Sequence, residues 1–282
     1  MTFDVCIHKF PSVPAYPRLT LTTSQWLCIE PFISGRKQDP GATGRDNRRF
    51  VEGVLWILRT GARWRDLPSY FGRWNSVYQR FRRWCLRGVW ARLLRRLTPT
   101  LRTPQIVLID STILRAHQHS TSWRGRYGVR AIGRSRGGLS TKIHGAVTPS
   151  WALCAHAITA GHRAYIWSAP RLLRQVRGRI AAVVGDRAYD SDAFVARVRA
   201  RGAVAAIPSR RRRRRPRAWS QSLYGGRHRV ENYFARLKHF RRLSSRFEKR
   251  VVCLRGFLFV ANVVVRVGQI STQEPQNGTL AA

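Results

Sequence analysis

The sequence has few acidic residues: 13 Asp and Glu stand against 53 Lys and Arg in 282 residues, which gives a formal net charge of +40. Lysine is scarce as well, since five of these 53 cations are Lys and the other 48 are Arg. A folded chain of this charge repels itself unless a polyanion neutralises it. Because the planar guanidinium group donates paired hydrogen bonds to phosphate, the composition predicts a nucleic-acid partner.

Cysteine and long apolar runs are also sparse. The five cysteines are scattered and contain no Cys-x-x-Cys pair, so they indicate neither a disulfide framework nor a thiolate zinc site. The longest apolar stretch, residues 256–265, is half of the roughly 20 residues that a bilayer requires. No basic segment near the start leads into an apolar run, as a secretory signal would. We therefore expect a cytoplasmic, nucleoid-associated protein with no membrane partner.

The first part of the chain has a helical pattern. The hydrophobic share of 44% is sufficient for a packed core, and the length suits one large domain or two ordinary ones. Apolar spacing and capping residues predict a first helix capped by Thr23 or Ser24, a second over residues 48–60 that stops at Gly61, and a third over residues 76–97.

The third of these helices would expose a row of arginines that includes Arg80 and Arg83. Two helices joined by a turn, of which the second is rich in arginine, resemble a DNA-binding helix-turn-helix. A helical bundle with a basic surface explains this stretch equally well.

Beyond residue 103 the pattern changes to that of strands and helices together. The runs 106–109 and 180–184 are apolar throughout, as in strands that are buried on both faces. Further strands are expected at 142–148 and 152–159, as a hairpin, and at 203–207; helices are expected at 167–177, 192–201, 227–240 and 251–267. This order predicts an α/β fold, a mixed sheet flanked by helices and preceded by a small all-helical domain.

Most of the acidic residues have a structural explanation. Asp46 is a natural N-cap, and Glu52 lies near the start of the same helix, where a carboxylate offsets the helix dipole. Asp190 and Asp192 precede a predicted helix and are explained as capping residues. Glu248 is flanked by cations, as in a surface ion pair.

Asp110 and Asp186 differ from these, because each follows a run of buried aliphatic residues. A carboxylate at the end of a central strand loses hydration unless a cation compensates it. In α/β sheets ligands gather at the carboxyl ends of strands. If the two strands are neighbours, the two carboxylates face each other and need a cation between them, for which a divalent metal is suitable.

Glu231 is the third candidate and lies on the helix predicted from residue 227. At 100° per residue, with Arg227 at zero, Glu231 falls at about 40° and Lys238 at about 20°. One helix face therefore presents a cation, an anion and a second cation beside the apolar stripe. The alternative is a surface helix with an i,i+4 salt bridge.

Four of these residues carry a resemblance. Their spacing, Tyr-x2-Arg-x3-Glu-x6-Lys, is similar to the signature of bacterial insertion-sequence transposases of the DDE type and is formed by Tyr224, Arg227, Glu231 and Lys238. Residues 110–117, 133–144 and 185–191 resemble the segments around the first and second aspartates of this family. Residues 63–74 resemble its helical N-terminal domain. The likeness runs from about residue 21 to 267, and Arg163 departs from it where an acid is usual.

The resemblance implies a ribonuclease H-like catalytic domain with Asp110, Asp186 and Glu231 as the catalytic, metal-binding triad. It implies two Mg²⁺ ions, for which Mn²⁺ can substitute. It also implies that Tyr224, Arg227 and Lys238 contact DNA near the cleaved end.

Further DNA contacts are expected from arginines around these residues. The run at 210–215 is predicted to clamp phosphates in the loop before the Glu231 helix, with a solvated charge tract as the alternative. The expected contacts are Arg80, Arg83, Arg210, Arg211, Arg212, Arg241 and Arg242.

We therefore expect a transposase that binds element ends, cleaves DNA by metal-dependent phosphodiester hydrolysis and joins the 3′-OH to target DNA by transesterification. Its partner would be double-stranded DNA, bound by a homodimer. The expected division is an unassigned segment 1–20, a helical DNA-binding domain 21–99, the catalytic domain 103–269 and a flexible tail 270–282. A metal-dependent nuclease of the same fold without strand transfer, and an inactive DNA-binding remnant, are the alternatives.

Overall fold

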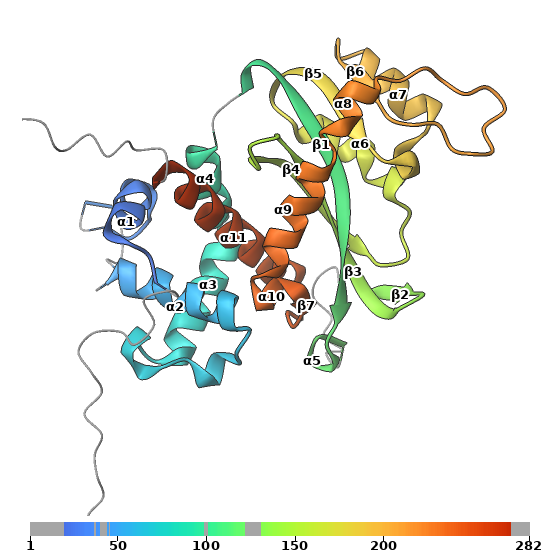
Figure 1. Cartoon of the computed structure of the whole chain (residues 1–282). Helices are drawn as coiled ribbons and strands as arrows, with labels where there is room; N and C mark the ends of the chain where they lie inside the picture. Colours follow the sequence, from blue (N-terminus) through green and yellow to red (C-terminus); the bar gives the residue numbers. More distant parts are fainter. Residues whose placement is uncertain are drawn as a thin grey trace, which may run out of the picture.

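The computed structural model describes residues 20–36, 38–39, 44, 46–98, 101–121 and 131–271. The expectations for segments 1–20 and 270–282 fall almost entirely outside these residues. The chain begins with four helices, α1 (Thr23–Ile29), α2 (Asn47–Thr60), α3 (Trp74–Leu86) and α4 (Val89–Leu97), and the short 3-10 turns η2 (Glu30–Phe32), η3 (Trp64–Asp66) and η4 (Ser69–Phe71). They form a separate group beside the sheet (Figure 1).

Local signals explain where some of these helices begin and end. Asp46 caps α2, since its carboxylate accepts the backbone N–H of Arg49 at 2.8 Å, and Gly61 ends the helix with a φ of 72°. The prediction of a single helix over residues 76–97 is wrong. Gly88 has a φ of 65°, a left-handed conformation through which a helix cannot continue, so the chain forms α3 and α4 instead.

The sheet that follows is mixed. Its strands are β1 (Leu101–Ala116), β2 (Gly133–Ser135), β3 (Gly138–Val147), β4 (Leu153–Ala160), β5 (Gly178–Gly185), β6 (Val204–Ala206) and β7 (Ser245–Arg246). Their order is β2-β3-β1-β5-β6, with β4 on β3 and β7 on β1. Strands β1, β3 and β4 are successively antiparallel, whereas β5 and β6 run parallel to β1 on its other side. This is the ribonuclease H-like arrangement, and the expected fold class is confirmed.

Strand β1 is longer than the sequence pattern predicts. The apolar run 106–109 was expected to end the strand at Asp110, but β1 continues to Ala116. Its parallel pairing with β5 does end there, at Ile109↔Gly185. Its antiparallel pairing with β3 continues as far as Arg115↔Ser140. Asp110 therefore lies where β1 loses one neighbour and keeps the other.

Helices cover both faces of the sheet. The remaining elements are α5 (Gln118–Thr121), η5 (Tyr165–Trp167), α6 (Ala169–Gln175), η6 (Arg187–Tyr189), α7 (Asp192–Arg199), α8 (Gln221–Gly225), α9 (His228–Lys238), α10 (Arg241–Ser244) and α11 (Val251–Ser271). One hydrophobic core lies between the sheet, α6 and α7. A second core joins the other face of the sheet to α9, α10, α11 and the N-terminal helices.

Helix α11 connects the N-terminal helices to the rest of the protein. It lies between them and α9 and α10 (Figure 1), and its Phe257 ring packs 4.5 Å from Phe81 of α3 and 6.0 Å from Trp64. By length and composition it could cross a membrane, but 61% of its most apolar segment is buried inside the protein. The last helix thus completes the core of the first ones.

An ion pair that the sequence places on the surface is in fact buried. Glu248, expected beside exposed cations, is 6% exposed. Its carboxylate lies 2.7 Å from the guanidinium of Arg242, which also donates to the backbone carbonyls of Gly61 and Ala62. The pair ties α10 to the end of α2, a contact between residues 180 positions apart that no local pattern predicts.

Replacing Gly256 of α11 by Ala tests this packing. The added methyl group would overlap Cys85 Sγ and lie 3.3 Å from the Phe81 ring, so we expect a loss of about 1–3 kcal/mol in the free energy of unfolding. Gly268→Ala in the same helix is the control: the new Cβ would meet no heavy atom within 4 Å, and we expect a gain of about 0.5–1 kcal/mol. Urea unfolding of both variants measures the difference. Equal effects would contradict the close approach of α11 to α3.

Candidate active site

Two of the three predicted acids lie next to each other because of the strand register. Ile109 of β1 and Gly185 of β5 are paired in parallel, so the next residues, Asp110 within β1 and Asp186 directly after β5, lie where the pairing of these two strands ends. Asp110 accepts the backbone N–H of Ser111 at 2.8 Å. Asp186 accepts the backbone N–H of Ala188 at 2.9 Å, which fixes the turn η6. The condition set by the sequence, that the two strands be neighbours, is confirmed.

Glu231 comes from α9, which packs across β1. Val230 and Leu237 of α9 are buried, and Phe234 lies against β3 at Gly145, where a Cβ would meet its ring at 3.2 Å. Glycine therefore permits the helix to approach the sheet closely. The side chain of Glu231 itself is 53% exposed.

Arg227 connects the acids. It is the N-cap residue of α9, and its guanidinium lies 2.7 Å from Glu231 Oε1 and 3.4 Å from Asp110 Oδ2. The i,i+4 salt bridge that the sequence left as an alternative is present, and it extends across to the sheet. One cation thus lies between two carboxylates that come from different elements.

Burial dominates the electrostatics of this site. The Asp110 side chain is 13% exposed, and burial raises its pKa to about 6, with the charges of Asp186 and Glu231 acting in the same direction and Arg227 opposing them. Tyr189, which is 0% exposed, has its pKa raised by burial and by the charges of Asp110 and Asp186. Tyr189 was not singled out from the sequence, although it lies in the segment 185–191.

Several polar groups around Asp110 are buried without a partner among the described residues: Ser111 Oγ, Tyr189 OH and Arg227 Nε. Buried polar groups of this kind normally bind water, an ion or a ligand. Carboxylate oxygens and water are also the ligands that Mg²⁺ prefers. Within the described ranges no three His, Cys, Asp or Glu residues are grouped closely enough to hold a metal. The Arg227 guanidinium lies between Asp110 and Glu231, and the carboxylate oxygens of Asp110, Asp186 and Glu231 are of the kind that a divalent ion binds.

The remaining residues of the four-point spacing lie around the same helix. Tyr224 is half-buried, with its ring 5.0 Å from that of Trp219, and the Arg227 guanidinium lies 6.0 Å from its centroid. Lys238 is exposed at the last turn of α9, and Arg241 is exposed just beyond it. These side chains are accessible to a polyanion along one side of α9.

Two arginines expected to contact DNA, Arg242 and Arg80, pack partly or wholly inside the protein. Arg242 is 6% exposed and its guanidinium is committed to Glu248 and to two carbonyls. Arg80 is half-buried, with its guanidinium 4.2 Å from the Phe50 ring and 5.0 Å from the Trp84 ring. The prediction for Arg242 is wrong, because an internal acid holds its side chain inside, whereas the DNA contact of Arg80 stays a prediction. Arg83 is exposed, as expected.

The acids that follow Asp186 also differ from their predicted role. The N-cap residue of α7 is Ser191, so Asp190 is not a cap, and Asp192 is the first helical residue. Asp190 instead pairs with Arg213 and Arg217. Of the predicted DNA contacts in this region, Arg211 and Arg212 are exposed, whereas Arg210 donates from its side chain to backbone carbonyls.

The strand order places the chain in the class of ribonuclease H-like proteins. Residues 21–94 match the family described as "Putative transposase of IS4/5 family", and residues 101–261 match the family described as "Transposase DDE domain". The second match spans more than half of the chain. The chain therefore belongs to the transposase DDE domain family and is a DNA transposase.

Curated relatives agree with this assignment. The chain is 30% identical over 131 residues to a "Putative transposase for insertion sequence element IS6501" of Brucella ovis, which covers 45% of this chain and 98% of that protein. It is 36% identical over 102 residues to an uncharacterized 16.2 kDa protein of insertion element IS402 from Burkholderia cepacia, covering 32% and 69%. An uncharacterized protein y4sN of Sinorhizobium fredii is 37% identical over 110 residues, covering 39% and 87%.

Solved structures that resemble the chain do so distantly. A piggyBac transposase synaptic complex with hairpin DNA has a TM-score of 0.49 at 12% identity, covering 93% of this chain and 79% of that one. The Mos1 strand transfer complex has a TM-score of 0.27 at 13% identity, covering 84% and 83%. The fold assignment given above depends on the strand order and on the family match.

Asp110→Asn tests the electrostatic cost of the site. Because the pKa of Asp110 in the folded protein is about 6, above its ordinary value of 3.8, the ionised carboxylate disfavours folding at pH 7. We expect the variant to be more stable than the unsubstituted protein by about 1–3 kcal/mol at pH 7 without metal, and the gain to vanish below about pH 4, where the carboxyl is protonated in both states. Thermal unfolding between pH 4 and 8 measures this.

The same measurement reports metal binding. Millimolar Mg²⁺ or Mn²⁺ should raise the Tm of the unsubstituted protein and leave that of the Asp110→Asn variant unchanged, because a ligand stabilises the state that binds it. An equal rise in both proteins would contradict a role of Asp110 as a metal ligand.

Proposed function

We propose that this transposase binds the ends of its element, hydrolyses a phosphodiester bond at each end with the acids Asp110, Asp186 and Glu231, and joins the freed 3′-OH to target DNA. The observation that supports this most is the linkage of the three acids: Asp110 and Asp186 follow the last paired residues of adjacent parallel strands, and Arg227 bridges Asp110 to Glu231. The insertion-element names of the relatives agree with this function.

Asp110 and Asp186 would hold divalent ions at the sheet edge, with Glu231 completing the ligand set from α9. Divalent ions held there would supply an activated water and would stabilise the charge that develops on the attacking and leaving oxygens. Asp110 must be ionised to act as a ligand. Burial raises its pKa and so disfavours the ionised form, and a cation beside the carboxylate compensates this cost. Its hydrogen bond from Ser111 N–H orients the carboxylate.

Arg227 has two alternative partners in this proposal. It neutralises Asp110 and Glu231 in the structure described here. When these acids bind metal, the guanidinium is free to bind a phosphate of the DNA, for which its planar fork is suited. Tyr224, which lies against it, and Lys238, about 10 Å further along α9 than Glu231, would contact the same strand.

Other parts of the chain would extend the DNA contact. Arg83 on α3 and Arg241 after α9 are exposed and would bind phosphates on either side of the acids. Joining two element ends requires two sets of catalytic acids, which a homodimer would supply. We also propose that this basic protein resides with the nucleoid, since its charge favours binding to any duplex.

The decisive experiment uses a donor DNA that carries the sequences flanking this gene, a supercoiled target plasmid and Mg²⁺. We expect Asp186→Asn and Glu231→Gln each to lower cleavage and strand transfer by at least about 10³-fold, because each removes one ligand of the ions that carry the chemistry. DNA binding, measured by fluorescence anisotropy in EDTA, should remain within about threefold.

Asp66→Asn is the matched control, since Asp66 is an exposed acid on η3, far along the chain from the sheet, and it should retain full activity. Cleavage without any joined product would favour the nuclease of the same fold. Full activity of either triad variant would refute the assignment of the triad.

A further inference from the structure

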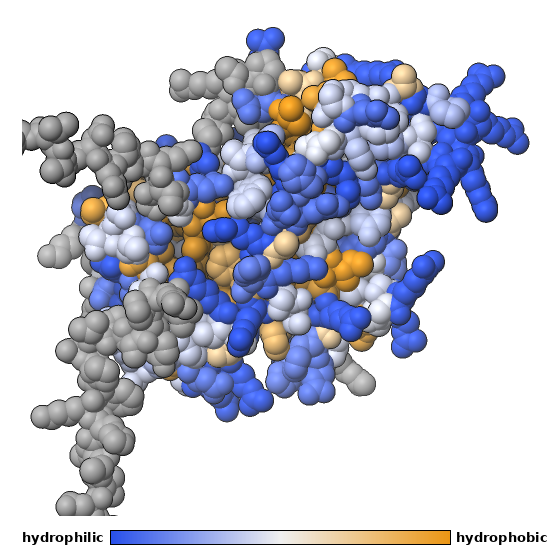
Figure 2. Space-filling view, viewed as in Figure 1, coloured by the Kyte–Doolittle hydropathy of each residue, from blue (hydrophilic) through white to orange (hydrophobic). Residues whose placement is uncertain are grey.

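The loop between β6 and α8, residues 207–219, carries seven arginines, at 210–215 and 217. We call it the arginine loop. It projects from the sheet beside α7 (Figure 1), and hydrophilic side chains extend into solvent from this corner of the molecule (Figure 2). Six consecutive cations repel one another, so a defined path for this loop needs internal compensation.

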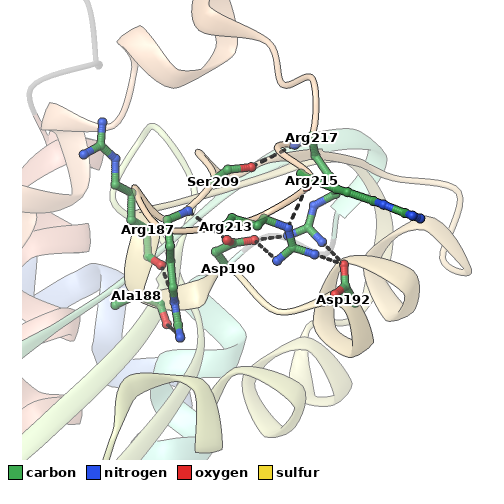
Figure 3. A network of polar contacts seen from close by, with 9 residues as sticks. Arg187, Ala188, Asp190, Asp192, Ser209, Arg213, Arg215 and Arg217 are labelled. Atoms are coloured by element: carbon green, nitrogen blue, oxygen red, sulfur yellow. Dashed lines mark hydrogen bonds and ion pairs between the residues drawn. The ribbon is translucent and has the colours of Figure 1, made fainter.

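Two carboxylates provide that compensation. The side chain of Asp190 is 0% exposed and pairs with Arg213, at 3.1 Å, and with Arg217. The same two arginines also pair with Asp192, whose side chain is 79% exposed (Figure 3). The backbone N–H of Arg210 donates to the second oxygen of Asp190 at 2.8 Å. Three residues of the loop are therefore bound to one buried carboxylate.

Hydrogen bonds within the loop fix its path further. The backbone N–H of Arg217 donates to Ser209 Oγ at 2.9 Å, which closes the base of the loop. Arg213 Nε donates to the carbonyl of Arg215 at 3.1 Å. The guanidinium of Arg210 lies 3.4 Å from the carbonyls of Arg187 and Ala188, the two residues that follow Asp186. The loop is thus attached to the turn that carries the second acid.

The arginines of the loop consequently fall into two groups. Arg210, Arg213 and Arg217 bind internal acceptors, and we call Asp190, Arg213 and Arg217 the clamp. The other four are exposed and form no ion pair with a carboxylate among the described residues. We call them the outward arginines: Arg211, Arg212, Arg214 and Arg215.

The two acids are not equivalent. Asp190 is fully buried, so a partner lost from it would leave an uncompensated charge inside the protein. Asp192 is mostly exposed, and pairs of that kind contribute little. Asp190 is therefore the residue that determines the conformation of the arginine loop.

We propose that the clamp holds the arginine loop as a preformed surface for the phosphate backbone of duplex DNA, with the outward arginines as the contacting groups and Asp190 as a positioning residue. This rests on the proposed function insofar as DNA is the partner. Seven cations less two acids leave the loop region strongly positive, and a fixed loop loses less entropy when it binds than a mobile one. The surface adjoins the turn of Asp186, so duplex bound there lies beside the catalytic acids.

The first test removes the outward arginines. The variant R211Q/R212Q/R214Q/R215Q keeps every clamp contact. We expect its affinity for a 30-bp duplex at 100 mM salt to fall by about 10- to 100-fold, and the slope of log K against log salt to become shallower by about 3–4, as for four lost phosphate contacts. The control R171Q/R174Q/R197Q/R199Q removes four exposed charges from α6 and α7 and should change the slope by less than about one.

The second test removes a negative charge. Charge alone predicts that Asp190→Asn binds DNA more tightly, whereas loss of the clamp predicts binding weaker by about fivefold or more, because the outward arginines are no longer held in place. Asp192→Asn makes the same change of charge at the exposed acid and should stay within about twofold.

Arginine footprinting of the unsubstituted protein with a dicarbonyl reagent needs no variant and therefore does not depend on folding of the Asp190→Asn protein. The outward arginines should react and be protected by duplex DNA, whereas Arg213 and Arg217 should resist modification with or without it. Three results would each overturn the proposal. They are equal protection of all six residues, a slope change no larger than in the control quadruple variant, and tighter binding by Asp190→Asn. All three measurements are made in EDTA, so their failure is distinct from a failure of the triad, which affects cleavage and joining alone.

Discussion

Carboxylates are the scarce component of this protein, and their placement determines which arginines fold inward. Within the described residues, nearly every acid that lies in or beside the sheet is paired with arginine: Asp110 and Glu231 with Arg227, Asp190 and Asp192 with Arg213 and Arg217, and Glu248 with Arg242. The pairs of Arg227 with Asp110 and of Arg213 and Arg217 with Asp190 join segments that are distant in sequence. Arg246 is an exception, since it is buried on backbone carbonyls and Thr141 rather than on a carboxylate.

The sequence predicts the fold of the sheet well because the decisive signals are local. Apolar runs mark β1 and β5, Gly61 ends α2, and the strand order agrees with the expected ribonuclease H-like class. The identity of ion-pair partners cannot be predicted in this way. Glu248 has cations next to it in sequence, yet tertiary packing selects Arg242 and buries both. The length of β1 also depends on tertiary pairing, since the strand continues beyond Asp110 where it still pairs with β3.

The sequence predicts which acids form the candidate site, but not how their side chains are paired. The apolar runs before Asp110 and Asp186, the helix face of Glu231 and the family resemblance led to these three acids, and their catalytic role remains a prediction. The sequence does not reveal the guanidinium between two of them, nor the nearby buried hydroxyls that have no partner among the described residues. Such an arrangement is less stable than a fully satisfied polar cluster. Proteins accept this cost at sites that are completed by a ligand, where stability and activity oppose each other.

The position of α11 has a consequence for biosynthesis. During translation the ribosome releases α1 to α4 first, with the aromatic side chains of Phe81 and Trp64 that later surround Phe257. Their shared core closes only after some 170 further residues have emerged and α11 arrives. Nascent chains therefore expose an unfinished apolar surface for most of their synthesis, and surface of this kind is prone to aggregate. Contacts of such long sequence separation also slow folding, so this shared core forms late.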